Sequence, residues 1–244
     1  MNIGLCSIFY NSVISGDLAR YMAQIEALDW PHDALRVFTV EGDSTDDTWA
    51  QLVAWHGRDA RVKCGKMDLH EPYMGSVDNP RRLWNCSTLG SYCREMALRD
   101  GWADAVLWLE SDLLWEPDLL KRLTAHGVDI VAPWVLVARD GGGVTDIPTL
   151  RGKGAIDFYD SWAYRYLPDG SQWFGPQPPR PNELTEVYSA GSCLLMRSDA
   201  ARASNAASTR AIVGWCERAR DAGFLVWVDP NTEVWHPWPR GKRE

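Results

Sequence analysis

Short apolar segments alternate with amphipathic segments along the first half of the chain. Residues 3–9, 37–40 and 105–109 are short and apolar, as expected of buried strands, and residues 61–67 form a further predicted strand. Apolar residues at helical spacing fill the segments between them. Strands that alternate with helices pair in parallel through right-handed crossovers. The pattern therefore predicts an α/β fold, Rossmann-like in its first half, with a mostly parallel central sheet flanked by helices.

Three amphipathic helices are predicted between these strands. The first spans about 17–28, and the second is expected to begin at Ser44, because an Asp three residues later completes an N-cap pattern. The third is longer and stops at Gly101, and its apolar face is formed by Cys86, Leu89, Cys93, Met96 and Ala97. A helix that starts near Pro117 and a strand at 130–133 continue the alternation.

The alternation breaks between residues 139 and 186. This segment contains a Gly-Gly-Gly run, a Pro-rich run and several Tyr and Trp residues. A long irregular segment within a compact domain is commonly a lid or a binding loop, and its aromatic content is untypical of disorder. A regular pattern resumes at residues 187–196, and a last strand is predicted at 224–228. Because no linker divides two cores, we expect a single domain over 1–244 with an inserted loop.

Composition and charge narrow the class of protein. The chain is 45% apolar and 24% charged, which is typical of globular proteins. No window approaches the ~18 apolar residues of a membrane span, and the N-terminus lacks the basic start of a secretory signal, so a cytoplasmic location is expected. The net charge of −8 disfavours nucleic acid as a partner. The six Cys show no zinc-ligand spacing and are predicted to be reduced core thiols.

Polar residues follow three of the predicted strands, at the point where each strand ends. They are Tyr10-Asn11, the segment from Glu41 to Ser44, and Glu110-Ser111-Asp112. Ligands of open α/β sheets bind outside the carboxyl ends of the strands, so these residues are expected to converge. Glu110 and Asp112, two apart in an extended segment, point the same way. Such carboxylates suit Mg²⁺ or Mn²⁺ bound to substrate phosphates, and capping of the next helix is the simpler alternative.

Two common nucleotide-binding classes are excluded by the absence of their glycine motifs. The chain contains no G-x-G-x-x-G dinucleotide fingerprint and no G-x-x-x-x-G-K-[ST] phosphate loop. A nucleotidyltransferase is also disfavoured, because its usual glycine- and lysine-bearing loop near the N-terminus is missing.

The acidic segment 40–48, the strand that ends in Glu110-Ser111-Asp112 and the closing Val234-Trp235-His236 together resemble the GT-A fold glycosyltransferases. In that superfamily a D-x-D or E-x-D pair holds a divalent metal against the diphosphate of a nucleotide sugar, and a late His often completes the coordination. Glu110 stands where Asp is commoner. The pattern is most similar to mannosyltransferases of the mannan-polymerase type. Residues 107–112, 117–120, 129–133 and 159–162 of this chain resemble the motifs of that family, in the same order.

The resemblance implies a role for each matching residue. Asp112, Glu110 and His236 would bind Mn²⁺ or Mg²⁺, with Glu110 able to bind ribose or water instead. The expected donor-binding residues are Tyr10 and Asn11 at the base, Glu41 and Ser44 at the nucleoside, and Arg81, Arg82 and Asn85 at the phosphate or sugar. Asp160 and Glu186 are expected to bind the acceptor or act as general base, and packed or surface roles are their simpler alternative. The sequence does not choose between inversion and retention of the sugar's stereochemistry.

The implied function is transfer of a hexose from a UDP- or GDP-sugar to an acceptor hydroxyl. The first half, 1–135, would bind the nucleotide sugar, and the second half, 136–244, would face the acceptor with the loop 139–186. The acceptor is a glycan, a small molecule or a hydroxymethylated DNA base. A non-catalytic sugar-binding module is the alternative from a different class. The 14 Trp, against 5 Phe, suggest sugar-stacking surfaces, with Trp162, Trp173, Trp235 and Trp238 in the loop or beside His236.

Overall fold

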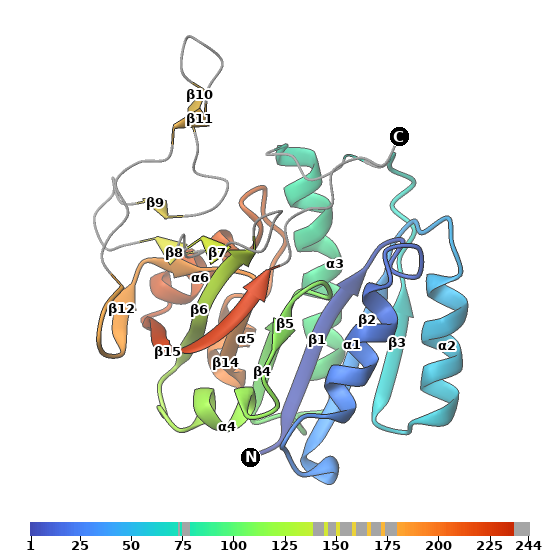
Figure 1. Cartoon of the computed structure of the whole chain (residues 1–244), viewed down its shortest axis with the longest axis horizontal. Coiled ribbons are helices and arrows are strands. Elements are labelled where there is room, and N and C mark those ends of the chain that lie inside the picture. Colours follow the sequence, from blue (N-terminus) through green and yellow to red (C-terminus); the bar gives the residue numbers. More distant parts are fainter. Residues whose placement is uncertain are drawn as a thin grey trace.

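A curled sheet with helices on both faces forms the body of the molecule (Figure 1). The structure is a computed structural model that describes residues 1–72, 74, 79–138 and 180–236, together with five two-residue strands between 144 and 173. The predicted site residues Asp160 and Trp162, and most of the loop 139–186, lie outside the described residues. Within the described part, no helix is long and apolar enough to cross a membrane.

The main sheet contains strands from both halves of the chain. Its main path runs through β12 (Thr185–Val187), β15 (Val226–His236), β6 (Ile130–Ala138), β14 (Cys193–Arg197), β4 (Ala105–Leu109), β1 (Ile3–Phe9), β2 (Leu35–Glu41) and β3 (Val62–Lys66). Two shorter strands extend it, because β5 (Leu114–Trp115) pairs with β15 and β7 (Val144–Thr145) pairs with β6. The strands predicted at 3–9 and 105–109 are confirmed with those bounds.

The direction of the strands differs from the expected, mostly parallel arrangement. β1 pairs in parallel with β2 and β4, β2 with β3, and β6 with β15. β14, however, runs antiparallel between β4 and β6, and β12 runs antiparallel to β15 at the edge. The sheet is therefore mixed. A buried strand has the same apolar pattern in either direction, so the sequence of β14 did not reveal its orientation.

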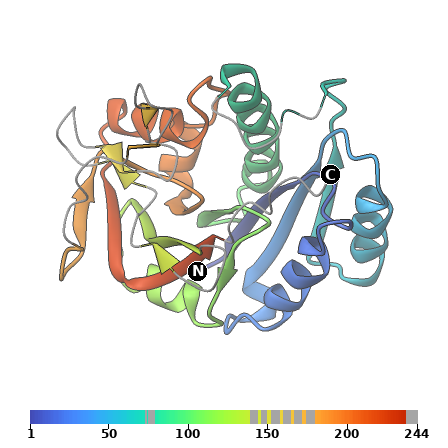
Figure 2. The ribbon, with the colours of Figure 1, turned by 45° about the horizontal axis from the view of Figure 1, so that its top comes forward.

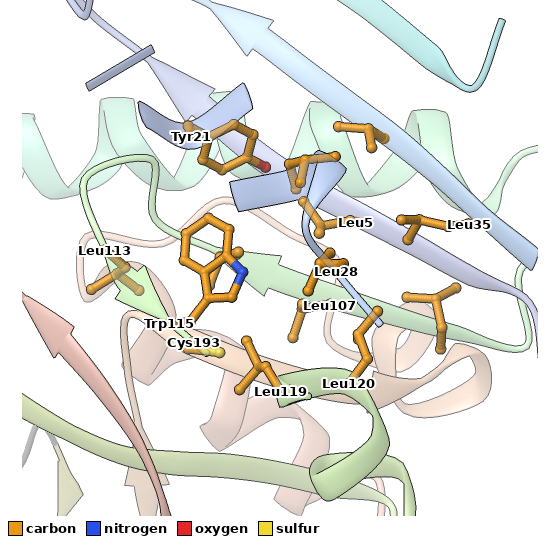
Figure 3. Close-up of a cluster of buried hydrophobic side chains, with 14 of the residues drawn as sticks. Leu5, Tyr21, Leu28, Leu35, Leu107, Leu113, Trp115, Leu119, Leu120 and Cys193 are labelled. Carbon is orange, nitrogen blue, oxygen red and sulfur yellow. The ribbon is translucent and has the colours of Figure 1, made fainter. Parts of the chain in front are cut away.

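Six α-helices described by the structure cover the two faces of this sheet. The helices α1 (Asp17–Glu26), α2 (Thr48–Arg58) and α4 (Leu119–Thr124) pack through Leu18, Tyr21, Leu52 and Leu119 into one core. Figure 3 shows part of this core around Tyr21, Trp115 and Leu107. The helices α3 (Pro80–Leu98), α5 (Ser198–Ala203) and α6 (Ala211–Asp221) pack into the second core, and Figure 2 shows α3 across the sheet from α1 and α2.

The start of α2 corrects one expectation from the sequence. The helix begins at Thr48 with Asp47 as its N-cap, so the prediction of a start at Ser44 is wrong. The side chain of Ser44 is used elsewhere, because its hydroxyl accepts a hydrogen bond from the backbone N–H of Asn11 at 3.0 Å. A local capping pattern does not reveal such a partner, which lies in a different loop.

Candidate functional site

The loop after β4 and the end of β15 meet at the carboxyl edge of the sheet, the upper edge in Figure 1. Glu110 follows β4 directly, and Asp112 lies in the turn that leads into β5. β5 then pairs antiparallel with β15 through Leu114 and Trp235. This pairing places the acidic turn beside His236, the last residue of β15, although more than a hundred residues separate them in sequence.

Glu110, Asp112 and His236 form a compact cluster of possible metal ligands. The Nε2 atom of His236 lies 3.4 Å from Oδ2 of Asp112 and 3.6 Å from Oε2 of Glu110. Each residue contributes one possible ligand atom, and these three atoms all lie within 4.8 Å of one another. Two ligands that each lie roughly 2.1 Å from one ion are separated by about 3 to 4 Å. The spacing therefore fits a single divalent cation.

The chemistry of these three groups also fits such an ion. Two carboxylate oxygens and one imidazole nitrogen suit Mn²⁺ or Mg²⁺ with water or phosphate in the remaining positions. The side chains are 31% exposed at Glu110, 38% at Asp112 and 20% at His236, so the cluster is open to a ligand on one side. The part of the chain that the structure describes contains no other cluster of this kind.

The two carboxyl groups of the cluster have opposite electrostatic environments. Burial and the negative charges of Glu110 and Asp17 raise the pKa of Asp112 despite the proximity of His236. Burial also disfavours ionised Glu110. The nearby His236, through hydrogen bonding and charge, outweighs this effect together with Ser192 and the charge of Arg82. The pKa of Glu110 is therefore lowered. A second negative charge is therefore unfavourable here until a cation binds.

Ser192 supports Glu110 and was not predicted from the sequence. Its carbonyl accepts a hydrogen bond from the backbone N–H of Glu110 at 2.9 Å, and its side chain helps to lower the pKa of the Glu110 carboxyl group. Ser192 is 7% exposed and has φ 64°, in the left-handed region that non-glycine residues rarely adopt. Such backbone strain clusters at functional sites. The only signal in the sequence is the Ala-Gly-Ser tripeptide before β14.

Arg82 brings positive charge to the site from the first turn of α3. It acts electrostatically on both Glu110 and Cys86, and it has no hydrogen-bonded or ion-pair partner among the described residues. Its neighbour Arg81 is ion-paired with Glu71, and Asn85 is 9% exposed. Asn79 caps α3 by accepting the N–H of Arg81 at 2.8 Å. Helix N-termini attract anions, so the start of α3 adds to the positive potential.

The loops after β1 and β2 are joined by reciprocal hydrogen bonds. The N–H of Asn11 donates to Ser44 at 3.0 Å, and the N–H of Thr45 donates to Oδ1 of Asn11 at 2.8 Å. Oε1 of Glu41 accepts the N–H of Ser44 at 2.6 Å, whereas Oε2 is buried without a hydrogen-bond partner in the described part of the chain. The structure thus brings together Asn11, Glu41 and Ser44 next to Tyr10. Glu41 retains one unused acceptor atom.

A second set of bonds between these loops was not foreseen. The carboxylate of Asp46 accepts the backbone N–H groups of Val13 at 3.1 Å, Ile14 at 2.9 Å and Thr48 at 3.0 Å. Burial opposes the charge on Asp46, but hydrogen bonds from Thr48, Ile14 and Val13 outweigh it and lower the pKa of Asp46. The hydroxyl oxygen of Thr48 accepts the N–H of Ser12 at 2.8 Å. The loops are therefore held in one arrangement before any ligand binds.

Glu186 is not brought to the metal cluster. It lies in β12, where it is ion-paired with Arg220 at 3.2 Å. Its register partner on β15 is Trp227, nine residues before His236. At about 3.3 Å per residue this separation corresponds to roughly 30 Å along the strand. Glu186 and the cluster therefore lie toward opposite ends of β15.

Comparison with known proteins reveals similarity at the level of structure. No protein-family model matches the chain, and no curated protein matches it either. TarS residues 1–349 from S. aureus, in complex with UDP-GlcNAc, matches with a TM-score of 0.62 and 16% identity, over 99% of this chain and 60% of that one. The mannosyltransferase PcManGT from Pyrobaculum calidifontis, in complex with GDP-Man and Mn²⁺, matches with a TM-score of 0.57 and 14% identity, over 99% and 58%.

These similarities establish the fold. The chain has the α/β architecture of GT-A-type glycosyltransferases, with the mixed sheet described above, and the predicted fold class is confirmed. The similar structures do not single out the mannan-polymerase-type family suggested by the sequence motifs. The chain spans about 60% of the length of the TarS structure.

Proposed function

We propose that the protein is a metal-dependent glycosyltransferase that transfers a hexose from a UDP- or GDP-sugar to an acceptor hydroxyl. The observation that carries this proposal is the cluster of Glu110, Asp112 and His236 at the carboxyl edge of the sheet, with ligand atoms within 4.8 Å. Two structures with the same fold are complexes with UDP-GlcNAc and with GDP-Man and Mn²⁺, which supports a nucleotide-sugar donor.

Each residue of the site has a defined task in this reaction. Asp112, Glu110 and His236 hold Mn²⁺ or Mg²⁺, which when bound neutralises charge on the departing diphosphate. Ser192 holds the main chain of Glu110 by accepting its backbone N–H, and it favours the ionised form of the Glu110 carboxyl group. Arg82, which has no ion-pair partner among the described residues, binds a phosphate oxygen. Such preorganised charges stabilise the negative charge that develops on the leaving group.

The loops after β1 and β2 bind the nucleoside. Oε2 of Glu41 is buried and lacks a hydrogen-bond partner in the described structure, and an unsatisfied buried acceptor costs roughly 1–3 kcal/mol. An N–H or hydroxyl group of the nucleoside would satisfy this atom. Asn11 and Ser44 hold the surrounding backbone by bonding to each other's loop. Their contribution to binding is therefore mainly the shape of the pocket.

The acceptor must lose its hydroxyl proton during transfer. Asp160 remains the predicted base or acceptor-binding residue, and Trp162 a predicted sugar-stacking residue. Glu186 is a weaker candidate for the base, because its ion pair with Arg220 and its place on β12 keep it from the cluster. The acceptor is a glycan, a small molecule or a modified DNA base, and the net charge of −8 gives the last little support.

Turnover of a panel of UDP- and GDP-sugars tests the proposal. Release of nucleoside diphosphate is measured with Mn²⁺, with Mg²⁺ and with a chelator, for the wild type and for Asp112→Asn. Loss of a metal ligand is expected to reduce donor hydrolysis by about 100-fold or more, corresponding to about 2.7 kcal/mol. Asp118→Asn is the matched control, because Asp118 is a neighbouring, 49% exposed acid whose only ion-pair contact among the described residues, to Arg122, is long at 3.9 Å.

Two results would contradict the assignment. Unchanged turnover in Asp112→Asn would show that the cluster does not hold the catalytic ion. Binding of a sugar nucleotide without metal dependence and without product release would favour the non-catalytic binding module instead.

A further inference from the structure

Helix α1 contacts the main chain at several points around the acidic loop, residues 110–113 between β4 and β5. Tyr21, fully buried in the core shown in Figure 3, hydrogen-bonds through its hydroxyl to Ser7 at 2.5 Å. Ser7 in turn donates to the carbonyl of Leu109, the residue before Glu110, at 2.5 Å. Tyr21 therefore helps to fix the point where the acidic loop begins.

One turn further along α1, Gln24 contacts the point where the loop ends. Its amide donates to the carbonyl of Trp115 at 3.3 Å. In the flipped orientation it instead donates to the carbonyl of Leu113 at 3.3 Å and accepts the N–H of Trp115 at 2.9 Å. Either orientation attaches α1 to the main chain at the entry to β5.

Arg20, the residue before Tyr21, contacts the middle of the loop, between the points fixed through Tyr21 and Gln24. Its Nη2 donates to the backbone carbonyl of Asp112 at 2.9 Å. The same atom lies 2.6 Å from Oδ1 of Asp17, and Oδ2 of Asp17 accepts the hydroxyl of Ser15 at 2.6 Å. Ser15, Asp17 and Arg20 thus form a continuous chain of polar contacts that ends on a residue of the metal cluster.

The Arg20 side chain is specialised for this contact. It is 28% exposed, so it neither fills the core as Tyr21 does nor extends freely into solvent. Its Nε is buried and has no hydrogen-bond partner among the described residues, so the contacts that orient the guanidinium there are those of Nη2 with Asp17 and Asp112. A planar guanidinium donates in two directions at once, to a carboxylate and to a carbonyl, which an ammonium group does less well.

We propose that Arg20 is a positioning residue for the metal cluster: by bonding the carbonyl of Asp112, it holds the turn so that the Asp112 carboxylate faces Glu110 and His236. This inference rests on the proposed function, because it assumes that the cluster binds a divalent ion. Residues that orient metal ligands without touching the ion typically change metal affinity or activity 10- to 100-fold when they are replaced.

Hydrogen exchange of the metal-free protein tests the structural part of this proposal. Arg20→Met keeps the length of the side chain and removes its donors. The amides of residues 111–114 are expected to exchange roughly 10-fold faster than in the wild type, with no change in the amides of α1. Arg36→Met is the control, because Arg36 has a similarly exposed side chain (34%) and is ion-paired with Asp100 at 2.7 Å, at the start of β2 and away from the cluster. Unchanged exchange at 111–114 in Arg20→Met would overturn the proposal.

Binding of Mn²⁺, followed through the electron paramagnetic resonance signal of the free ion, tests the functional part. We expect Arg20→Met to weaken binding 10- to 100-fold, Arg20→Lys to recover part of the loss, and Arg36→Met to match the wild type. Wild-type affinity in Arg20→Met would contradict the positioning role. Absence of Mn²⁺ binding by the wild type, with or without nucleotide, would instead overturn the proposed function, and the exchange experiment would still decide whether Arg20 holds the loop.

Discussion

Three single residues in rare backbone conformations lie at the carboxyl edge of the sheet. Asn11, Asp43 and Ser192 have φ values of 46°, 60° and 64°, although none is glycine. Such conformations cost of order 1–3 kcal/mol each and persist where surrounding contacts impose them. Here the contacts are the hydrogen bonds between the loops and to Glu110. These three residues therefore lie where the nucleotide and the metal are proposed to bind.

Arg82 provides a prediction at the scale of one side chain. Arg82→Met should weaken binding of a nucleoside diphosphate about 10- to 100-fold in the presence of Mn²⁺, because a charge-assisted hydrogen bond to phosphate contributes about 1.5–3 kcal/mol. Binding of the corresponding nucleoside should change little. Calorimetric titration of both ligands measures the difference, with Arg36→Met as control. An equal loss for both ligands would indicate a general structural effect rather than contact with phosphate.

The sequence indicated some site residues and not others, for physical reasons. Glu110 and Asp112 were recognisable because carboxylates rarely end a buried apolar strand. His236 was identified only through the family resemblance, since a single His near the end of a chain carries little information. Ser192, Asp46 and Arg20 act through contacts between segments far apart in sequence. Local patterns carry no information on such contacts.

At the scale of elements, the irregularity in β15 determines where His236 lies. The register between β15 and β6 shifts between Asp229 and Glu233. Asp229, 4% exposed, accepts the hydroxyl of Thr232 at 2.5 Å and the N–H of Asn231 at 2.8 Å, and it lies 3.0 Å from Nε2 of His126. Extra residues in a strand bend it and increase its twist. The bonds to Asp229 therefore stabilise the bend that precedes His236.

Asp229 also predicts a pH dependence of stability. Burial opposes its charge, but the hydrogen bonds from Thr232, His126 and Asn231 prevail and lower its pKa in the folded state. A lowered pKa stabilises the fold above the unfolded-state pKa of about 3.9, and this stabilisation is lost as the pH falls through the folded-state value. Asp229→Asn should reduce the free energy of unfolding at pH 7 by about 1–3 kcal/mol.

Urea unfolding between pH 7 and pH 3 measures this effect. The difference between the wild type and Asp229→Asn should shrink as the pH falls. The exposed residue Asp33 provides the control Asp33→Asn, which should match the wild type. A difference for Asp229→Asn that stays constant with pH would show that the carboxylate charge does not contribute.

At the scale of the molecule, the fold was predictable and the paths of two strands were not. Alternating apolar and amphipathic segments identified β1 and β4 with their bounds, and the fold comparison confirms the α/β class. The antiparallel direction of β14 and the β5–β15 pairing depend on how the chain returns after residue 139, which periodicity does not encode. The β5–β15 pairing, which brings His236 to the acidic loop, was therefore not predictable from the sequence pattern.

The tryptophans also have a clearer distribution at this scale. Five of them, Trp55, Trp108, Trp115, Trp134 and Trp215, are at most 6% exposed and belong to the two cores. Trp235 is partly buried against the second core, next to His236. Trp162 and Trp238 lie outside the described residues. Much of the unusual Trp content therefore serves packing. The expectation of sugar stacking still rests on Trp162, Trp173, Trp235 and Trp238.

Metal-dependent binding of a nucleoside diphosphate tests the central claim most directly. Calorimetric titration of UDP and of GDP into the wild-type protein, with Mn²⁺ and then with a chelator, compares the two affinities without needing to know the acceptor. The cluster of Glu110, Asp112 and His236 predicts that at least one nucleotide binds 10-fold or more tightly with Mn²⁺, a difference of about 1.4 kcal/mol. Equal affinity of both nucleotides with and without the ion would contradict the account.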